Sequence, residues 1–213
     1  MTYKFEEISA YVKDVFQKNK GSHDWDHTER VLHMAEKLAA AEGADIDIVR
    51  YAALLHDISR HDEDISKGYV HHEEKGATES KKVLIMFNID EITADKVSDC
   101  IRMHRFRRGN KPETIEGKVL FDADKLDGIG AIGIGRAFVF AGENGARVHD
   151  PYIQVDKTYS YTKEDTAYRE YLVKLSNIKD RILTATAKNI AIERHQFMID
   201  FFDRINAECK GDL

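Results

Sequence analysis

The chain has 213 residues, of which 42% are hydrophobic and 33% charged, with a net charge of −6. This length and composition are typical of one globular domain with its own core, and the acidic balance argues against a surface that binds nucleic-acid polymers. No run of eighteen apolar residues is present, and the N-terminus lacks the basic and apolar parts of a secretion signal, so we expect no membrane span and a cytoplasmic protein.

Apolar residues recur at helical rather than strand intervals through most of the chain, and only two prolines interrupt it. The first stripe ends near Gly21 and the second near Gly43, since glycine often follows a helix C-terminus. Further stripes predict helices around residues 49–56, 77–87, 97–104, 119–140 (one or two helices) and 190–205. We therefore predict an all-α fold, a single compact helical domain covering 1–213.

Two segments have the composition of loops. Residues 107–114 are polar and include glycine and proline, and residues 141–162 combine two glycines, a proline and several tyrosines. A loop as long as the second one inside a compact domain is often functional, for example as a lid. The two cysteines, Cys100 and Cys209, match no zinc spacing and are expected to be reduced thiols.

Histidine and aspartate side chains recur at places where a helical core has no need of them. His27 follows an acidic N-terminal segment, His56 and Asp57 end an apolar run, and Asp124 lies among three acids in an otherwise apolar stretch. Imidazole and carboxylate together are ligands for a catalytic divalent ion, whereas an unpaired buried aspartate is costly. The first two segments also have plain structural explanations, namely a polar, capped helix start around His27 and a hydrogen-bonded core histidine followed by a C-terminal aspartate at 56–57.

In this order, these residues resemble the H…HD…D motif of the HD-domain phosphohydrolase superfamily, and the segments 23–31, 122–133 and 192–198 resemble a small stand-alone bacterial group within it. The resemblance implies a helical fold and a metal-dependent hydrolase of phosphoester or phosphoanhydride bonds. It also implies that His27, His56, Asp57 and Asp124 hold a divalent ion such as Mn²⁺, Fe²⁺, Co²⁺ or Mg²⁺. The alignment of the Ala-Asp pair favours Asp124 over Asp122 as the last ligand.

Other side chains near the motif are candidates for catalysis and substrate binding. Asp57 can also accept a proton from water, while His72 and His104 could hold a second metal, contact a phosphate, or only cap helices. Arg60 and Lys75 are expected to bind phosphate, although Arg60 could instead be a cation at a helix C-terminus. Arg60 and His61 stand where relatives that hydrolyse (p)ppGpp carry Glu-Asp, which argues against alarmone hydrolysis.

The preferred function is hydrolysis of a small phosphorylated substrate, namely a nucleotide. We favour a nucleoside triphosphate pyrophosphohydrolase or another hydrolase of phosphoanhydride or phosphoester bonds. Two alternatives remain: an HD-type di-iron oxygenase, which His72 and His104 would complete, and a metal- or nucleotide-binding module without turnover. The segment 128–133 also satisfies G-x-G-x-x-G, but no strand precedes it, so we interpret its glycines as sites of close helix packing. The sequence does not predict an oligomeric state.

Overall fold

We describe the protein from a computed structural model, in which residues 2–16, 25–66, 68–105 and 111–213 are placed. All regular secondary structure within these ranges is helical, which confirms the all-α prediction. Two compact units are distinguished, one ending at Asp124 and the other running from Lys125 to Leu213, and each is described by itself. The single domain over 1–213 stays a prediction.

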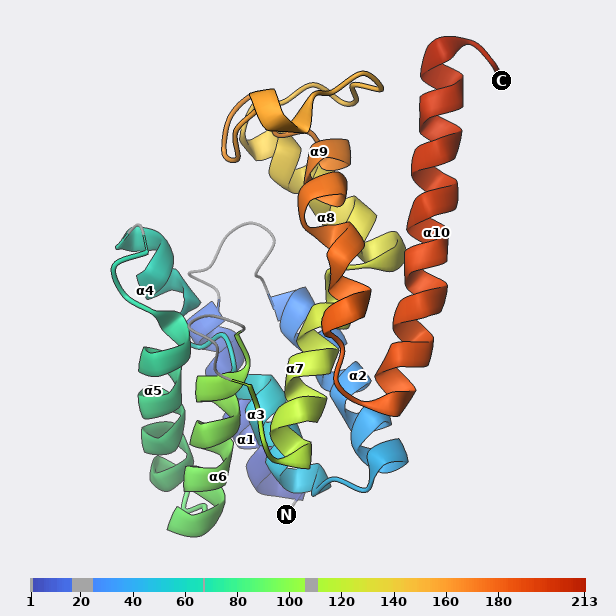
Figure 1. Cartoon of the computed structure of the whole chain (residues 1–213). Coiled ribbons are helices and arrows are strands. Elements are labelled where there is room, and N and C mark those ends of the chain that lie inside the picture. The colour runs from blue at the N-terminus through green and yellow to red at the C-terminus, as the bar shows by residue number, and fades with distance from the viewer. Residues whose placement is uncertain (1, 17–24, 67, 106–110) are drawn as a thin grey trace. The chain divides into compact units, whose positions relative to one another are not determined.

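The first unit is a bundle with α3 in its interior (Figure 1). Its helices are α1 (Thr2–Phe16), α2 (Trp25–Glu42), α3 (Ile46–Leu55), α4 (Arg60–Ile65), α5 (His72–Met86), α6 (Glu91–Met103) and most of α7 (Ile115–Asp127). Seven of the ten residues of α3 are buried, and the helix packs against α1, α2 and α6. A helix with so many buried apolar residues requires such a central place, and the His-Asp pair follows directly after its last residue.

The helices α5 and α6 pack closely as an antiparallel pair (Figure 1). The start of α5 and the end of α6 therefore lie at the same end of the pair, which brings His72 and His104 together although 32 residues separate them. The Asp90 side chain caps α6 by accepting a hydrogen bond from the backbone N–H of Thr93 at 3.0 Å. This capping bond satisfies one of the free donors at the helix start.

The second unit contains α8 (Gly130–Glu143), α9 (Ala167–Val173) and α10 (Ala185–Lys210), with short 3₁₀ helices at Val155–Lys157 and Leu175–Arg181. The long loop expected at 141–162 is present as largely irregular chain after α8. The buried guanidinium of Arg169 holds it by donating to the Asp165 carboxylate at 2.9 Å and to the Oγ1 and carbonyl oxygen of Thr158. A lid function for this loop stays a prediction.

The glycine-rich segment after Asp127 forms the turn into α8. A Cβ on Gly133 would overlap the carbonyl of Gly128, and a Cβ on Gly130 would lie 3.0 Å from Cγ of Arg194. Gly130 also has a positive φ of 76°, which glycine adopts at little cost. The expectation that these glycines serve close packing is thus confirmed, and the segment follows helix α7 rather than the strand that precedes a Rossmann phosphate loop.

Several sequence predictions need correction or fall outside the described residues. The helices α4 and α9 were not predicted, because each is short and α4 is almost entirely polar. Arg60 is the first residue of α4, so the alternative in which it stabilises a helix C-terminus is wrong. Gly21, and residues 107–110 of the loop expected at 107–114, lie outside the described ranges.

Candidate metal centre

The His-Asp pair lies where α3 ends. Leu55 is the last residue of the helix, His56 is its C-cap, and Asp57 follows in a turn in which the Arg60 N–H bonds the Asp57 carbonyl at 2.9 Å. The pair was expected on the helix itself. Both side chains are buried, since His56 is fully enclosed and Asp57 is 3% exposed.

His27 and Asp124 approach the pair from two other helices, α2 and α7. The Nε2 atoms of His27 and His56 are 3.3 Å apart, and an Asp124 oxygen lies 3.6 Å from Nε2 of His27. One carboxylate oxygen of Asp57, Oδ2, is 3.8 Å from His27 and 3.7 Å from His56. The structure thus brings together all four residues of the H…HD…D motif.

The other carboxylate oxygen of Asp57, Oδ1, faces a second pair of imidazoles. It is 3.1 Å from Nε2 of His72 and 3.9 Å from Nε2 of His104, and these two nitrogens are 3.3 Å apart. Both histidines are buried. Asp57 therefore stands between two groups of donor atoms, which we call the first half (with His27, His56 and Asp124) and the second half (with His72 and His104) of the cluster.

Three of the imidazoles are oriented through Nδ1. The Nδ1 of His56 lies 2.7 Å from the Ala53 carbonyl, and the Nδ1 of His104 lies 2.6 Å from the Ile101 carbonyl, three residues earlier in each case. The Nδ1 of His72 contacts the Glu63 carboxylate. A carbonyl or carboxylate at Nδ1 holds the proton on that nitrogen and leaves the Nε2 lone pair directed into the cluster.

The protonation of these histidines follows from their burial and neighbours. Burial, with His72 and His56 nearby, lowers the pKa of His104 to about 3. Burial also lowers the pKa of His56, although Asp57 opposes this effect. His72 differs. Burial lowers its pKa as well, but the hydrogen bond and negative charge of Asp57, together with the hydrogen bond to Glu63, more than compensate, so the pKa of His72 is raised. His56 and His104 are thus neutral at neutral pH, the state in which imidazole binds metals.

Glu63, on α4, is buried beside His72. Its carboxylate accepts hydrogen bonds from Nη1 of Arg105 at 2.9 and 2.8 Å and from the backbone N–H of His72 at 3.3 Å, in addition to the contact with the His72 ring. Burial alone would raise the pKa of Glu63, but the hydrogen bonds from Arg105 and His72 lower it to about 2. Sequence analysis missed Glu63 and Arg105, which no motif or local spacing connects to the cluster.

The two predicted phosphate-binding residues are paired with acids. Nε of Arg60 is 3.3 Å from Asp64, and Nζ of Lys75 is 3.0 Å from Asp62. Lys75 and its partner are about 40% exposed, and such pairs contribute little free energy, so the lysine can exchange its partner for a ligand at small cost. Their role as substrate ligands stays a prediction.

The donor atoms of the cluster suit a divalent cation. Four imidazoles and two carboxylates converge from five parts of the chain, and the groups His27, His56, Asp124 and Asp57, His72, His104 each have ligand atoms within 4.8 Å of one another. Asp122 belongs to no such group among the described residues and is fully buried, which fits the choice of Asp124. The buried carboxylate of Asp57 lies beside the neutral imidazoles of His56 and His104 and needs positive charge nearby, which a metal ion supplies.

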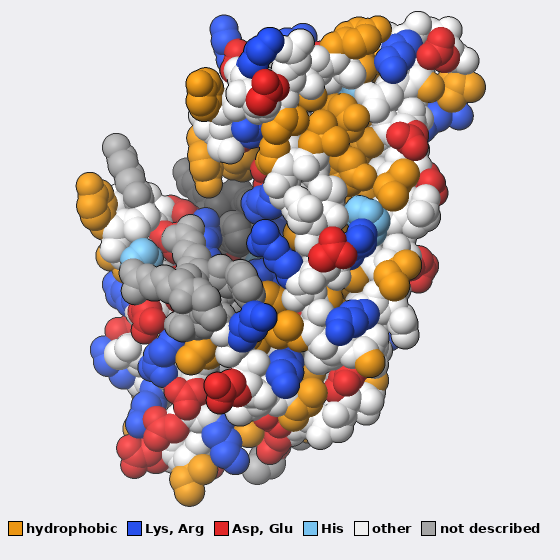
Figure 2. Space-filling view, in the orientation of Figure 1, with side chains coloured by type: hydrophobic (Ala, Val, Ile, Leu, Met, Phe, Trp, Pro, Cys, Tyr) orange, Lys and Arg blue, Asp and Glu red, His pale blue; other side chains and the backbone are white. Residues whose placement is uncertain are grey.

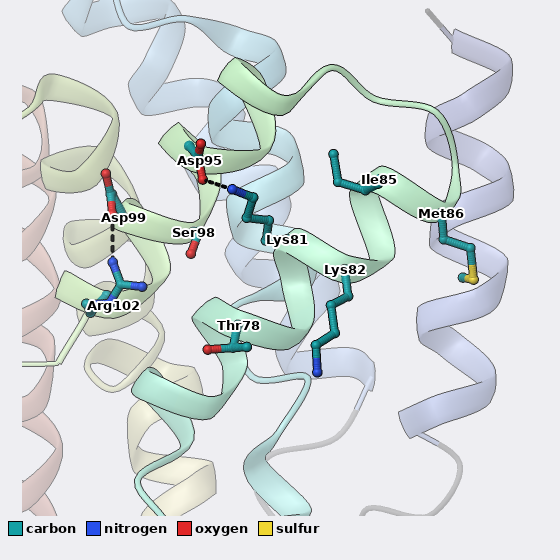
Figure 3. A pocket seen from close by; sticks show the side chains of 9 residues that line it. All are labelled: Thr78, Lys81, Lys82, Ile85, Met86, Asp95, Ser98, Asp99 and Arg102. Atoms are coloured by element: carbon teal, nitrogen blue, oxygen red, sulfur yellow. Dashed lines mark hydrogen bonds and ion pairs between the residues drawn. The ribbon is translucent and has the colours of Figure 1, made fainter.

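A groove between α5 and α6, with a volume of about 720 Å³, lies apart from these residues (Figure 3). None of the cluster residues lines it. Two of its cations are already paired, Lys81 with Asp95 and Arg102 with Asp99, as the dashed lines in Figure 3 show. Acidic and basic side chains also alternate over the part of the surface around α5 and α6 in Figure 2. We assign no ligand to the groove.

Comparison with known proteins places these features in a family. The HD-domain family model matches residues 24–129, the range that contains the whole cluster. The uncharacterized protein YpgQ of Bacillus subtilis is 34% identical over 210 residues, or 97% of this chain and 94% of that protein. This protein belongs to the HD-domain family.

Solved structures agree over nearly the full chain. The crystal structure of YpgQ in complex with ADP aligns with a TM-score of 0.74 at 32% identity, covering 97% of this chain and 95% of that one. An HD-superfamily hydrolase from Bacillus thuringiensis aligns with a TM-score of 0.77 at 30% identity, covering 98% of both chains. The predicted family and fold class are therefore confirmed, and membership identifies the chain as an HD-superfamily hydrolase by homology. No described helix is long and apolar enough to cross a membrane.

Proposed function

We propose that this protein is a metal-dependent phosphohydrolase that acts on a nucleotide, with a phosphoanhydride bond of a nucleoside triphosphate as the favoured target. The observation that carries the proposal is the buried Asp57 carboxylate, which presents one oxygen to His27 and His56 and the other to His72 and His104. The ADP bound in the YpgQ structure supports a nucleotide as the ligand class.

His27, His56, Asp57 and Asp124 would hold the metal ion, and His72 with His104 offer ligands for a second ion beside Asp57. A divalent ion bound there lowers the pKa of water and polarises a phosphoryl oxygen. Mn²⁺, Fe²⁺, Co²⁺ and Mg²⁺ all accept carboxylate ligands, and imidazole favours the first three.

The residues of the chain contribute orientation and proton transfer. The Asp57 oxygens lie next to every Nε2 of the cluster, so this carboxylate is placed to accept a proton from an attacking water. Hydrogen bonds at Nδ1 keep His56 and His104 from rotating, which holds the site in one geometry before substrate arrives. Arg60 and Lys75 would neutralise phosphate charge after leaving Asp64 and Asp62.

The proposal is tested with protein stripped of metal by a chelator and then supplied with each ion separately. Nucleoside tri-, di- and monophosphates are offered, and phosphate and pyrophosphate release are measured separately to identify the bond that is cleaved. We expect turnover with at least one ion and its loss in Asp57→Asn, whose side chain has the same shape but no negative charge. Metal-dependent turnover that persists in Asp57→Asn, or no release from any nucleotide, would refute it.

A di-iron oxygenase is the second candidate, because His72 and His104 complete the H…HD…H…H…D ligand set around Asp57. Iron analysis of protein purified without added metal, together with oxygen-electrode measurements, separates the two functions. Oxygen consumption without phosphate release would favour the oxygenase. A binding module without turnover would bind ADP but would neither hydrolyse nucleotides nor consume oxygen.

A further inference from the structure

Within the second half of the cluster, His72 is supported differently from His104 and from His56 of the first half. His56 and His104 are each held at Nδ1 by a main-chain carbonyl three residues earlier, whereas His72 is held by the side chain of Glu63. Glu63 lies on α4 and His72 is the first residue of α5, so this contact joins two helices. The orientation of His72 therefore depends on a charged side chain from another element.

A carboxylate at Nδ1 has two physical effects on an imidazole. It accepts the Nδ1 proton and so fixes the ring with Nε2 toward Asp57, 3.1 Å away. It also makes Nε2 a stronger electron donor, and removing such a partner from a metal ligand typically weakens metal binding by about 10- to 100-fold. A main-chain carbonyl gives the same orientation with a weaker electronic effect because it carries no net charge.

Arg105 keeps Glu63 in place. Its Nη1 contacts both oxygens of the Glu63 carboxylate and lies 3.0 Å from Nδ1 of His72, and it also reaches Glu73 at 3.4 Å. A buried carboxylate without a cation would be unstable, so Arg105 allows Glu63 to remain ionised beside the ring. Since Arg105 directly follows His104, this contact also connects Glu63 to the other imidazole of the second half.

We propose that Glu63, fixed by Arg105, is a positioning residue that makes the second half of the cluster, Asp57 with His72 and His104, able to bind a divalent cation of its own. The Glu63 carboxylate contacts His72, a residue of the second half, so we expect its loss to affect the second ion and to leave the first ion bound. This inference rests on the proposed function in one respect, namely that the cluster binds metal. It goes further by identifying the residue that controls binding of the second ion.

The experiment is a titration of metal-free full-length protein with Co²⁺, followed by visible absorption and by direct metal analysis after gel filtration. We expect the wild type to take up two ions per chain. We expect Glu63→Gln to take up the first ion with unchanged affinity and to bind the second at least about tenfold more weakly. Glutamine keeps the size of the side chain and removes its charge, so the change in affinity reports on the negative charge beside Nδ1 of His72.

Glu73→Gln is the matched control. Glu73 is also buried and also within reach of Arg105, but its carboxylate is 3.9 Å from Nδ1 of His72, beyond a hydrogen bond. This variant should bind both ions as the wild type does. Circular dichroism and melting temperature without metal establish that each variant is folded, and Arg105→Lys replaces Glu63→Gln if the latter does not fold, with the same expected loss of the second ion.

Three results would overturn the proposal: a wild type that takes up one ion only, a Glu63→Gln protein that binds both ions unchanged, and equal weakening of both ions in that variant. Nucleotide hydrolysis is measured in parallel, so that the two proposals fail separately. Selective loss of the second Co²⁺ in a protein that hydrolyses no nucleotide would support the role of Glu63 and refute the hydrolase. Nucleotide hydrolysis by the wild type, together with unchanged Co²⁺ uptake in Glu63→Gln, would support the hydrolase and refute the role of Glu63.

Discussion

Asp124 and Asp122 lie two residues apart on α7, and the structure gives them different surroundings. An oxygen of Asp124 is 3.6 Å from Nε2 of His27, while Asp122 is fully buried outside the described ligand groups. We predict that Asp124→Asn lowers the affinity for Mn²⁺ by at least about tenfold, since a ligand oxygen loses its charge. Isothermal titration of metal-free protein with Mn²⁺ measures the change.

Asp122→Asn is the control for that substitution, because it removes a carboxylate from the same helix that belongs to none of the ligand groups among the described residues. It should keep wild-type Mn²⁺ affinity even if its melting temperature falls. Loss of Mn²⁺ binding in Asp122→Asn with retention in Asp124→Asn would reverse the assignment of the two aspartates.

The two cysteines differ in accessibility. Cys100 is buried in α6, and burial raises the pKa of its thiol to about 12, whereas Cys209 is exposed near the end of α10. The thiolate is the reactive species, so a maleimide or disulfide reagent at neutral pH should modify one thiol per folded chain and both after denaturation. Mass spectrometry of the labelled peptides identifies the site, and fast labelling of Cys100 in the native protein would contradict its burial.

At the scale of single residues, the sequence predicted the parts of the site that a linear motif contains. His27, His56, Asp57 and Asp124 could be located because their order and flanking residues resemble a family. Glu63 could not, since its contact with Arg105 spans 42 positions and depends on how α4 meets the end of α6. Charged residues on polar helices have no local pattern that distinguishes a buried contact from a solvated one.

The turn between α7 and α8 tests how strictly two glycines are required. A Cβ on Gly133 would overlap the Gly128 carbonyl, but nothing lies within 4 Å of a Cβ on Gly135, two residues further along the same helix. We predict that Gly133→Ala clearly lowers the melting temperature, because the turn must open. Gly135→Ala should be neutral or stabilising by up to about 1 kcal/mol, as expected for alanine in a helix interior.

The cap of α6 gives a prediction about pH. The backbone N–H of Thr93, together with its hydroxyl, lowers the pKa of Asp90 below its ordinary value of 3.8. A carboxyl whose pKa is lower in the folded state stabilises the fold above the unfolded pKa, and this contribution disappears as pH falls through the folded pKa. Asp90→Asn should therefore melt below the wild type at neutral pH, and the two melting temperatures should converge in acid. A constant difference at every pH would show that charge is not involved.

At the scale of helices, periodicity predicted the long amphipathic elements and failed for the short ones. The stripes around residues 31–39 and 97–104 correspond to α2 and α6, since each buries one face against the core. The short helix α4, with the sequence RHDEDI, buries little apart from Glu63, so no apolar period could indicate it. Its helical form depends on neighbours distant in sequence.

For the whole molecule, the position of the cluster predicts where metal binding stabilises the chain. The six residues of the cluster, His27, His56, Asp57, His72, His104 and Asp124, belong to the unit that ends at Asp124. A ligand that binds only the folded state raises the free energy of unfolding by about 2.7 kcal/mol when its concentration is 100 times its Kd. We predict that Mn²⁺ slows hydrogen exchange in α2, α3, α5 and α6, and leaves α9 and α10 unchanged. Equal protection of α10 would mean that the two units unfold together.

The fold class was predictable because apolar residues recur at helical intervals through most of the chain and strand-like alternation is almost absent. The division at Asp124 was not predictable, since no linker rich in glycine or proline marks it and α7 runs through it. The class of function, a metal-dependent hydrolase, could be predicted because the histidine and aspartate residues of the motif are typical metal ligands. The base and the scissile bond depend on contacts with a substrate.

The main-chain carbonyls that hold His56 and His104 have a consequence for how this centre can vary. Ala53 and Ile101 contribute only their backbone oxygens, so exchanging either side chain leaves the acceptor in place and the ring orientation intact. The acceptor for His72 is a side chain, and one nucleotide change in its codon can remove it. The orientation of His56 and His104 is thus robust to mutation, while that of His72 can be changed in a single step, which offers evolution or an engineer a way to alter metal content without rebuilding the site.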